Sequence, residues 1–98
     1  MNITYDPENG TPYGDAHCED ILKNSAKTGI DIVTSTENII NMARALVHEE
    51  VLDHRDVVFL FKDHYIRVDK FGEISDYPPG FCEFTLNTLL RLFDQKDK

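Results

Sequence analysis

The stretch GIDIVTSTENII, residues 29–40, places a short β-branched run directly before an amphipathic segment. Residues 30–34 contain one polar side chain, which suits a strand buried in a parallel sheet. Residues 36–52 then carry apolar side chains at helical spacing, on one face formed by Ile39, Ile40, Ala43, Leu46 and Val47. A strand that leads straight into a helix is the repeating unit of parallel sheets. We therefore expect an α/β fold.

The remaining segments fit this fold class. Short apolar or alternating runs predict three further strands, at residues 2–5, 57–61 and 64–69. Helical spacing predicts helices at residues 15–27 and 83–93, and Gly29 is expected to end the first of them in a left-handed cap. The order β-α-β-α-β-β-α predicts a small α/β sandwich of βαβ units, with parallel core strands, an antiparallel edge hairpin and a C-terminal helix.

A chain of 98 residues has the length of one domain. We expect a single domain over residues 1–98, built from the parts that follow in chain order. They are a strand and acidic turn (1–14), an αβα unit (15–56), a hairpin with the C-terminal helix (57–93) and a frayed tail (94–98).

The net charge of −8 is unevenly distributed and bears on the choice of partner. Residues 1–20 contain five acidic side chains and no Lys or Arg, and the ten basic residues are scattered singly after them. Binding to DNA or to anionic membranes needs clustered cations, so we expect neither as a direct partner. Without a signal-like or membrane-spanning run, and with Cys18 and Cys82 as reduced thiols, the sequence predicts a cytoplasmic protein.

The hydroxyl residues Thr34, Ser35 and Thr36 at the strand-to-helix junction have two interpretations. With Glu37 they match a capping box, in which Thr34 caps the helix and Glu37 reaches back to the free amides. The same helix start, at the carboxyl edge of a parallel sheet, could instead bind a phosphate. It lacks the glycine-rich loop and lysine of a P-loop, so local reasoning favours the cap.

The acidic turn after the first strand is the second candidate site. Asp6 and Glu8 could hold a magnesium ion or orient a water molecule, although Asp-Pro and Glu-Asn-Gly are also ordinary turn formers. His17 and Cys18 point about 100° apart on a helix, so they do not predict a metal site. We expect no metal and no cofactor.

Read together, these segments resemble the C-terminal half of SMC/RecF-like ABC-type ATPases, including those of phage-defence systems. In that family an acidic Walker B strand leads through a helix and a glycine to a second strand that ends in Thr-His-Ser-Glu. The similar segments here are, in chain order, ITYDPEN (3–9), DAHCEDILKNSAKTG (15–29), IDIVTSTENIINMARALV (30–47), VLDHRDVVFLFKD (51–63) and GEISDYPPGFCEF (72–84). The last resembles the tail Asp-Trp-Pro-x-Gly-Phe-Phe-Asp of one branch.

The departures from this family decide what the resemblance implies. Tyr5 stands where the first Walker B acid would be, and Ser35 replaces the switch histidine that would contact the γ-phosphate. Glu8 aligns with the acid that polarises the attacking water and is kept. No Walker A loop or signature motif occurs in these residues, so we expect no ATP hydrolysis by this chain alone.

The resemblance thus implies a non-catalytic interaction or regulatory module derived from an ABC-type ATPase half-domain. Such a half-domain would leave one edge or face of its sheet uncovered, so we expect a protein partner or a homodimer, through the strand near Ile3 or Ile32. The alternative is an ATPase subunit that completes a nucleotide site in trans with a P-loop partner. In that case Glu8 would be the catalytic base, and Thr34, Ser35 and Thr36 would bind the nucleotide.

Overall fold

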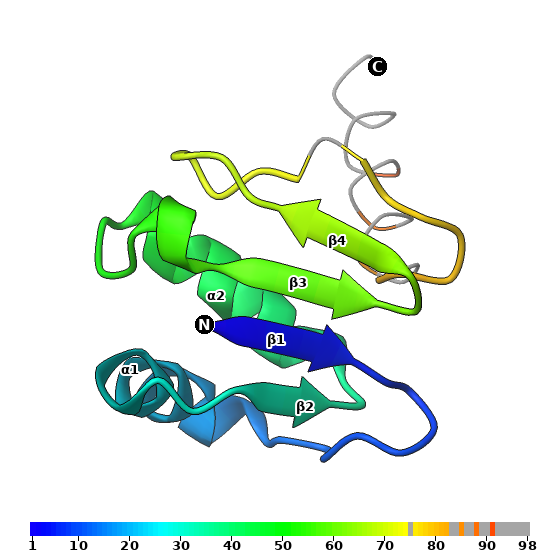
Figure 1. Cartoon of the computed structure of the whole chain (residues 1–98), viewed down its shortest axis with the longest axis horizontal. Coiled ribbons are helices and arrows are strands. Elements are labelled where there is room, and N and C mark those ends of the chain that lie inside the picture. The colour runs from blue at the N-terminus through cyan, green and yellow to red at the C-terminus, as the bar shows by residue number, and fades with distance from the viewer. Residues whose placement is uncertain (75, 83–84, 86–87, 89–90, 92–98) are drawn as a thin grey trace.

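Four strands form one mixed sheet in the computed structural model, which describes residues 1–74, 76–82, 85, 88 and 91 (Figure 1). They are β1 (Asn2–Tyr5), β2 (Ile32–Thr34), β3 (Val58–Phe61) and β4 (His64–Arg67), in the spatial order β2-β1-β3-β4. β1 pairs in parallel with both β2 and β3, and β3 pairs antiparallel with β4. The α/β class, the parallel core strands and the antiparallel edge hairpin are confirmed.

Two α-helices within residues 1–74 pack on one face of this sheet. They are α1 (Cys18–Thr28), preceded by the 3₁₀ turn η1 (Asp15–His17), and α2 (Glu37–His48). A second 3₁₀ turn, η2 (His54–Asp56), leads into β3. In Figure 1, α2 lies behind β1 and β3, and α1 packs against α2. Gly29 ends α1 with φ 72°, the left-handed cap that the sequence predicts.

The strand register explains which side chains reach the helices. Ile3 of β1 is paired with Ile32 of β2 and with Phe59 of β3, and Phe59 is paired in turn with Ile66 of β4. Paired residues share a face, and all four are buried. This row forms the floor of the core, and the apolar stripe of α2 covers it.

Phe81 completes the core from the segment that follows the hairpin. Its ring is fully buried, with ring centroids 5.7 Å from Tyr5, 5.6 Å from Phe61 and 6.3 Å from Phe59. Aromatic pairs at such distances add to the free energy gained from burying their area. The residues of the predicted tail motif therefore serve as part of the hydrophobic core.

Several predicted element boundaries need correction. β2 begins at Ile32, because Ile30 is 63% exposed and precedes the paired residues. α2 ends at His48, four residues before the predicted end, because Glu50 adopts a left-handed conformation with φ 64°. The predicted helix at 83–93 and the tail at 94–98 lie outside the described residues, apart from 85, 88 and 91. Of the helices in the described part, none is long and apolar enough to cross a membrane.

Candidate functional site

The acidic turn and the hydroxyl-rich junction lie together at the carboxyl edge of the sheet. β1 and β2 are parallel neighbours, so the turn after Tyr5 starts beside Thr34. The amide of Asp6 donates to the carbonyl oxygen of Thr34 at 2.8 Å. The structure thus brings the turn that carries Glu8 against the junction of Thr34, Ser35 and Thr36.

Thr11 attaches this turn to the outer edge of β2. Its amide donates to the carbonyl oxygen of Val33 at 3.1 Å, and its own carbonyl oxygen accepts from the amide of Ser35 at 3.0 Å. Gly10 lies so close that a Cβ atom there would be 2.3 Å from the carbonyl carbon of Thr34. The turn therefore packs directly on the backbone of the junction.

The hydroxyl groups of the junction hydrogen-bond to the chain itself. Thr34 is fully buried, and its Oγ1 accepts from the amide of Thr36 at 3.1 Å and lies 3.2 Å from the carbonyl oxygen of Thr11. Asn38 Oδ1 accepts from the amide of Ile39 at 2.9 Å. A bound phosphate would need such amides as donors. Here the amides of Ser35, Thr36 and Ile39 already have acceptors.

The capping box predicted at this junction is wrong. The residue that caps α2 is Thr36, whose side chain makes no cap hydrogen bond, and Thr34 lies in β2. Glu37 does not reach back to the free amides. Its Oε1 instead accepts from the amide of Thr85 at 2.9 Å and from the hydroxyl of Thr85 at 2.6 Å. The Glu37 carboxylate therefore hydrogen-bonds to a residue late in the chain and not to the amides at the start of its own helix.

Glu8 itself is exposed in a turn organised by its neighbour. Asp6 Oδ1 accepts from the amide of Glu8 at 3.2 Å and from that of Asn9 at 3.1 Å, as in an Asx turn. Within the part of the chain that the structure describes, no three His, Cys, Asp or Glu residues gather closely enough to hold a metal ion. The geometry supports a turn-forming role for this carboxylate segment.

Both cysteines are free and buried, which makes them poor nucleophiles. Burial raises the pKa of the Cys82 thiol to about 12, and the nearby Glu37 carboxylate adds to this effect while Arg44 opposes it. Burial also raises the pKa of Cys18, with Asp15 adding to it. The thiolate is the reactive form of cysteine, so both side chains are unreactive as nucleophiles in the folded protein.

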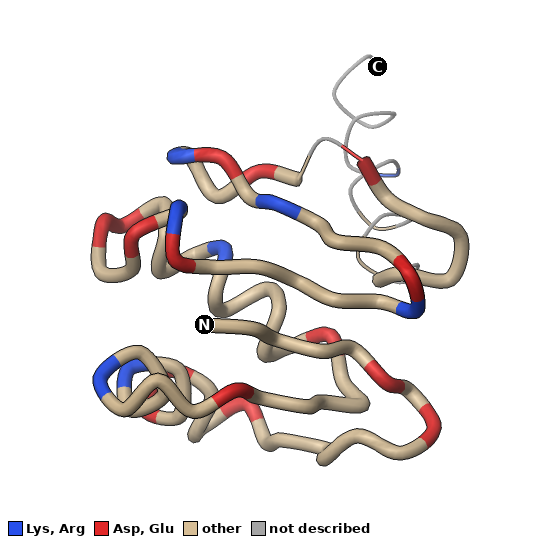
Figure 2. Tube along the Cα trace, in the orientation of Figure 1, with Lys and Arg blue, Asp and Glu red and all other residues tan. Residues whose placement is uncertain are grey.

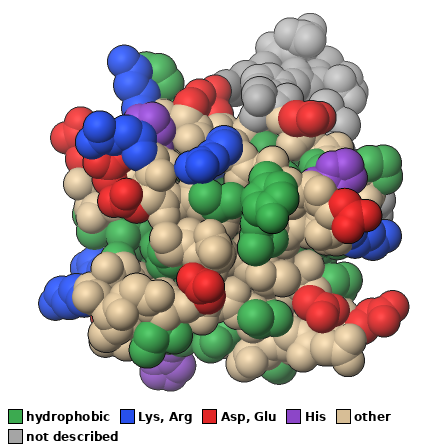
Figure 3. Space-filling view, viewed as in Figure 1, with side chains coloured by type: hydrophobic (Ala, Val, Ile, Leu, Met, Phe, Trp, Pro, Cys, Tyr) green, Lys and Arg blue, Asp and Glu red, His purple; other side chains and the backbone are tan. Residues whose placement is uncertain are grey.

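The face of the sheet opposite the helices keeps access to solvent. Its central row runs across all four strands, because the register pairs Thr4 with both Val33 and Leu60, and Leu60 with Tyr65. Val33 is 46% exposed and Tyr65 81% exposed. Figure 3 views this face and shows hydrophobic side chains at the surface over the sheet. We call the row Val33–Thr4–Leu60–Tyr65 the open row.

A second row on the same face ends in opposite charges. The register pairs Asn2 with Val58, and Val58 with Arg67, while Asp31 lies beside Asn2 and accepts from its amide at 3.1 Å. Asp31 therefore lies at the β2 side of the face and Arg67 at the β4 side. Figure 2 shows these two positions, one acidic just before β2 and one basic on β4. We call Asp31–Asn2–Val58–Arg67 the charged row.

The sequence signals only part of this face. Alternation in residues 64–69 indicates a strand with one wet face, which places Tyr65 and Arg67 toward solvent. The run VVFLF, by contrast, carries no sign that Leu60 and Val58 face away from the core. Only the pairing between strands reveals that they align with Tyr65 and Arg67.

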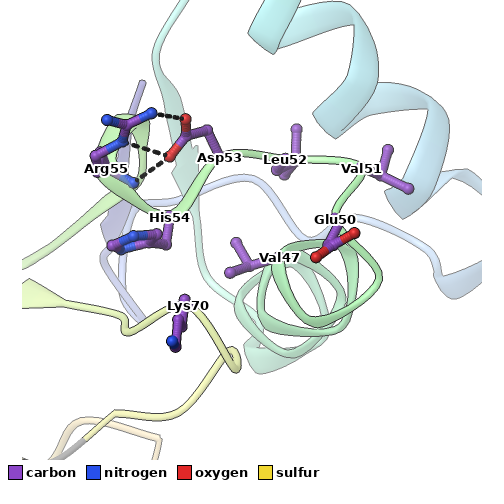
Figure 4. Close-up of a pocket in the computed structure, with 8 residues that line it drawn as sticks. All are labelled: Val47, Glu50, Val51, Leu52, Asp53, His54, Arg55 and Lys70. Atoms are coloured by element: carbon purple, nitrogen blue, oxygen red, sulfur yellow. Dashed lines mark hydrogen bonds and ion pairs between the residues drawn. The ribbon is translucent and has the colours of Figure 1, made fainter.

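A cavity of about 550 Å³ lies where α2, η2 and the loop after β4 meet (Figure 4). Its charged lining residues include Glu50, Asp53, Arg55 and Lys70. Arg55 turns toward Asp53 and donates to its two carboxylate oxygens at 3.1 and 2.7 Å. These hydrogen bonds hold the pKa of Asp53 well below its usual range. The charges of this pair offset each other, so the cavity offers no strong field for a charged ligand.

Two regions are thus the candidate sites, the β2–α2 junction with the acidic turn and the open face of the sheet. The first has the placement of a nucleotide site, but the amides of Ser35, Thr36 and Ile39 are engaged within the chain. The second presents apolar and charged side chains to solvent. Comparison with protein-family models, with curated proteins and with solved structures finds no match for this chain.

Proposed function

We propose that the chain is a non-catalytic protein-interaction module that associates through the open face of its sheet. The observation that carries this proposal is the open row, in which Val33 and Tyr65 remain exposed beside the half-buried Leu60. Exposed apolar side chains that share one face of a protein mark a candidate binding surface. Tyrosine is also enriched where proteins bind one another, since its ring buries a large area with few torsions to fix.

The chemistry of the junction supports a role without catalysis. The amides of Ser35 and Thr36 donate to Thr11 and Thr34, so these two donors are not free to bind a phosphate. The raised pKa values of Cys18 and Cys82 likewise argue against a thiol nucleophile. With two free, buried cysteines, we further propose that the module acts in the cytoplasm.

Site-specific photo-crosslinking in cells tests this proposal. A photoreactive phenylalanine analogue at Tyr65 is expected to give a discrete crosslinked protein species. The same analogue at Phe71, which is 57% exposed on a loop away from the open row, is the matched control and is expected to give none. Excess wild-type protein should suppress the crosslink, whereas a Tyr65→Lys competitor should not. No crosslink at Tyr65, or equal crosslinking at both positions, would overturn the proposal.

We propose, as the alternative, an ATPase subunit that completes a nucleotide site in trans. The contact between the turn of Glu8 and the junction favours it, since the resemblance to ABC-type ATPases requires these two segments to meet. It predicts nucleotide-dependent association with a P-loop partner, and loss of the partner's turnover in a Glu8→Gln variant that still binds. If the partner hydrolyses ATP equally well with Glu8→Gln, the alternative fails. We also propose that the interaction module derives from an ABC-type ATPase half-domain.

A further inference from the structure

We infer that the occupant of the open face is a second copy of this chain, placed face to face about a two-fold axis that runs parallel to the strands between β1 and β3. The inference rests on the proposed function, since it names the partner for the same surface. The strand register carries it. Under that rotation, the open row and the charged row of one copy each face the same row of the second copy, with complementary side chains in contact.

The rotation exchanges β1 with β3 and β2 with β4 between the two copies. In the open row it places Val33 against Tyr65 of the second copy, and Thr4 against Leu60 of the second copy. Each contact occurs twice, as an isologous interface requires. The exposed aliphatic and aromatic side chains would cover each other, which removes the apolar area that each copy leaves in water.

The charged row is complementary under the same rotation. Asp31 at the β2 side meets Arg67 of the second copy at the β4 side, and the reverse pair forms as well. Both side chains are exposed, and neither forms an ion pair with any residue that the structure describes. Among the described residues, Asp31 accepts only from the amide of Asn2, and Arg67 donates to the carbonyl oxygen of Arg55 at 3.3 Å. Each charge therefore has capacity for a partner from outside its own copy.

The geometry of packed sheets accommodates this arrangement. Sheets that pack face to face lie about 10 Å apart with their strands within about 30° of one another. Near the axis this twist displaces Thr4 and Leu60 little, and the long side chains of Tyr65 and Arg67 can span the larger displacement at the edges. Four short strands offer less than the ~800 Å² per partner of a standard interface. The dimer is therefore weak, with a dissociation constant on the order of 10 µM.

Charge-swap variants of the full chain test both the occupant and the axis. Sedimentation equilibrium is expected to show a concentration-dependent dimer for the wild type. Asp31→Arg would set arginine against arginine twice, and Arg67→Asp would set aspartate against aspartate twice, so each variant alone should weaken the dimer roughly tenfold or more. An equimolar mixture of the two variants restores opposite charges at both contacts. It should form a mixed dimer, detectable by native mass spectrometry, near wild-type strength.

Controls separate failure of folding from failure of the interface. Asp31→Arg removes the acceptor of the Asn2 amide, so thermal unfolding of each variant must first show that it folds. Glu73→Arg, an exposed charge change on the loop after β4, is the matched control and should leave the dimer intact. If Asp31→Arg fails to fold, Arg67→Asp, which leaves the Asp31 acceptor in place, tests the contact alone and should still weaken the dimer roughly tenfold or more.

Any one of the following results would overturn the inference. A wild type that stays monomeric at 500 µM, roughly fifty times the expected dissociation constant, rules out the second copy. A dimer that ignores both charge swaps, or a mixture that forms no mixed dimer, rules out this axis. A crosslink from Tyr65 to a different protein, with a monomeric wild type, rejects the second copy while the proposed function stands. Absence of any crosslink rejects both.

Discussion

The amide of Ser35 donates a 3.0 Å hydrogen bond to the carbonyl oxygen of Thr11, which joins the start of α2 to the turn after β1. Because of this bond, the amide of Ser35 is not free to bind a phosphate at the start of the helix. The same bond holds the acidic turn against β2. The close packing of the turn there depends on Gly10, the residue before Thr11.

Gly10→Ala is expected to destabilise the protein by roughly 2 kcal/mol or more, because the new Cβ would lie 2.3 Å from the carbonyl carbon of Thr34. Backbone atoms on both sides must move to accept it. Gly14→Ala is the matched control, since nothing lies within 4 Å of its Cβ position. Urea unfolding of both variants checks this. Equal stability of the two would contradict the close packing of the turn.

Glu50→Gly should raise the free energy of unfolding by about 0.5–1 kcal/mol. Glu50 follows α2 with φ 64°, its amide donates to Val47, and the amide of Val51 donates to Leu46 at 2.9 Å. This is a Schellman motif, where glycine is the preferred residue. Glu50→Gln separates the backbone effect from removal of a negative charge at the helix C-terminus. Thermal unfolding should rank glycine above glutamine, and the reverse order would contradict this account.

The Schellman motif shows where sequence reasoning stopped short. The apolar spacing of α2 was readable, because it reflects burial against the sheet. The end of the helix was not, because a glutamate in the left-handed conformation carries no local signal. The capping box failed for a related reason. Glu37 accepts a hydrogen bond from Thr85, which lies 48 positions further along the chain and could not be inferred from the local sequence. The α/β class, the parallel core strands and the antiparallel hairpin were predictable from pattern, whereas hydrogen bonds between distant segments were not.

The candidate surface, too, was only partly predictable from the sequence. The sequence predicts that one edge or face of the sheet stays uncovered and that contact runs through the strand near Ile3 or Ile32, and this stays a prediction. Ile3 lies on an inner strand, and both side chains point into the core. The exposed partners are the alternate residues Thr4 and Val33. A shift of one position along a strand exchanges core for surface, so only the register could settle this point.

Phe81→Ala should cost about 3–5 kcal/mol of stability, because it empties the middle of the aromatic cluster formed with Tyr5, Phe59 and Phe61. Phe71→Ala, at a position 57% exposed, is the control and should cost well under 1 kcal/mol. Chemical denaturation followed by circular dichroism measures both. A small effect at Phe81 would show that the segment after the hairpin is not part of the cooperative core.

Stability should fall between pH 9 and pH 12, partly through Cys82. The pKa of its thiol is raised from 9.0 to about 12 in the folded protein, so the unfolded chain loses this proton first as the pH rises. The folded state then holds more protons, and its stability declines by at most about 1.4 kcal/mol per pH unit. Below pH 9 the contribution is fully present. Cys82→Ser does not titrate there, so urea unfolding at pH 8, 9 and 10 should give it a shallower decline than the wild type. Parallel declines would contradict the assignment.

Thr34→Val tests whether the hydroxyl residues of the junction serve the fold or a ligand. The change keeps the shape of a fully buried side chain but removes the acceptor of the Thr36 amide, which should cost about 1–3 kcal/mol. Thr4→Val, the same substitution on the half-buried open face, is the control and should be nearly neutral for stability. If the hydroxyl only supports the fold, Thr34→Val leaves dimer strength and partner turnover unchanged under conditions where it remains folded. Loss of nucleotide-dependent partner activity in folded Thr34→Val would instead assign the junction to a ligand and favour the in-trans alternative.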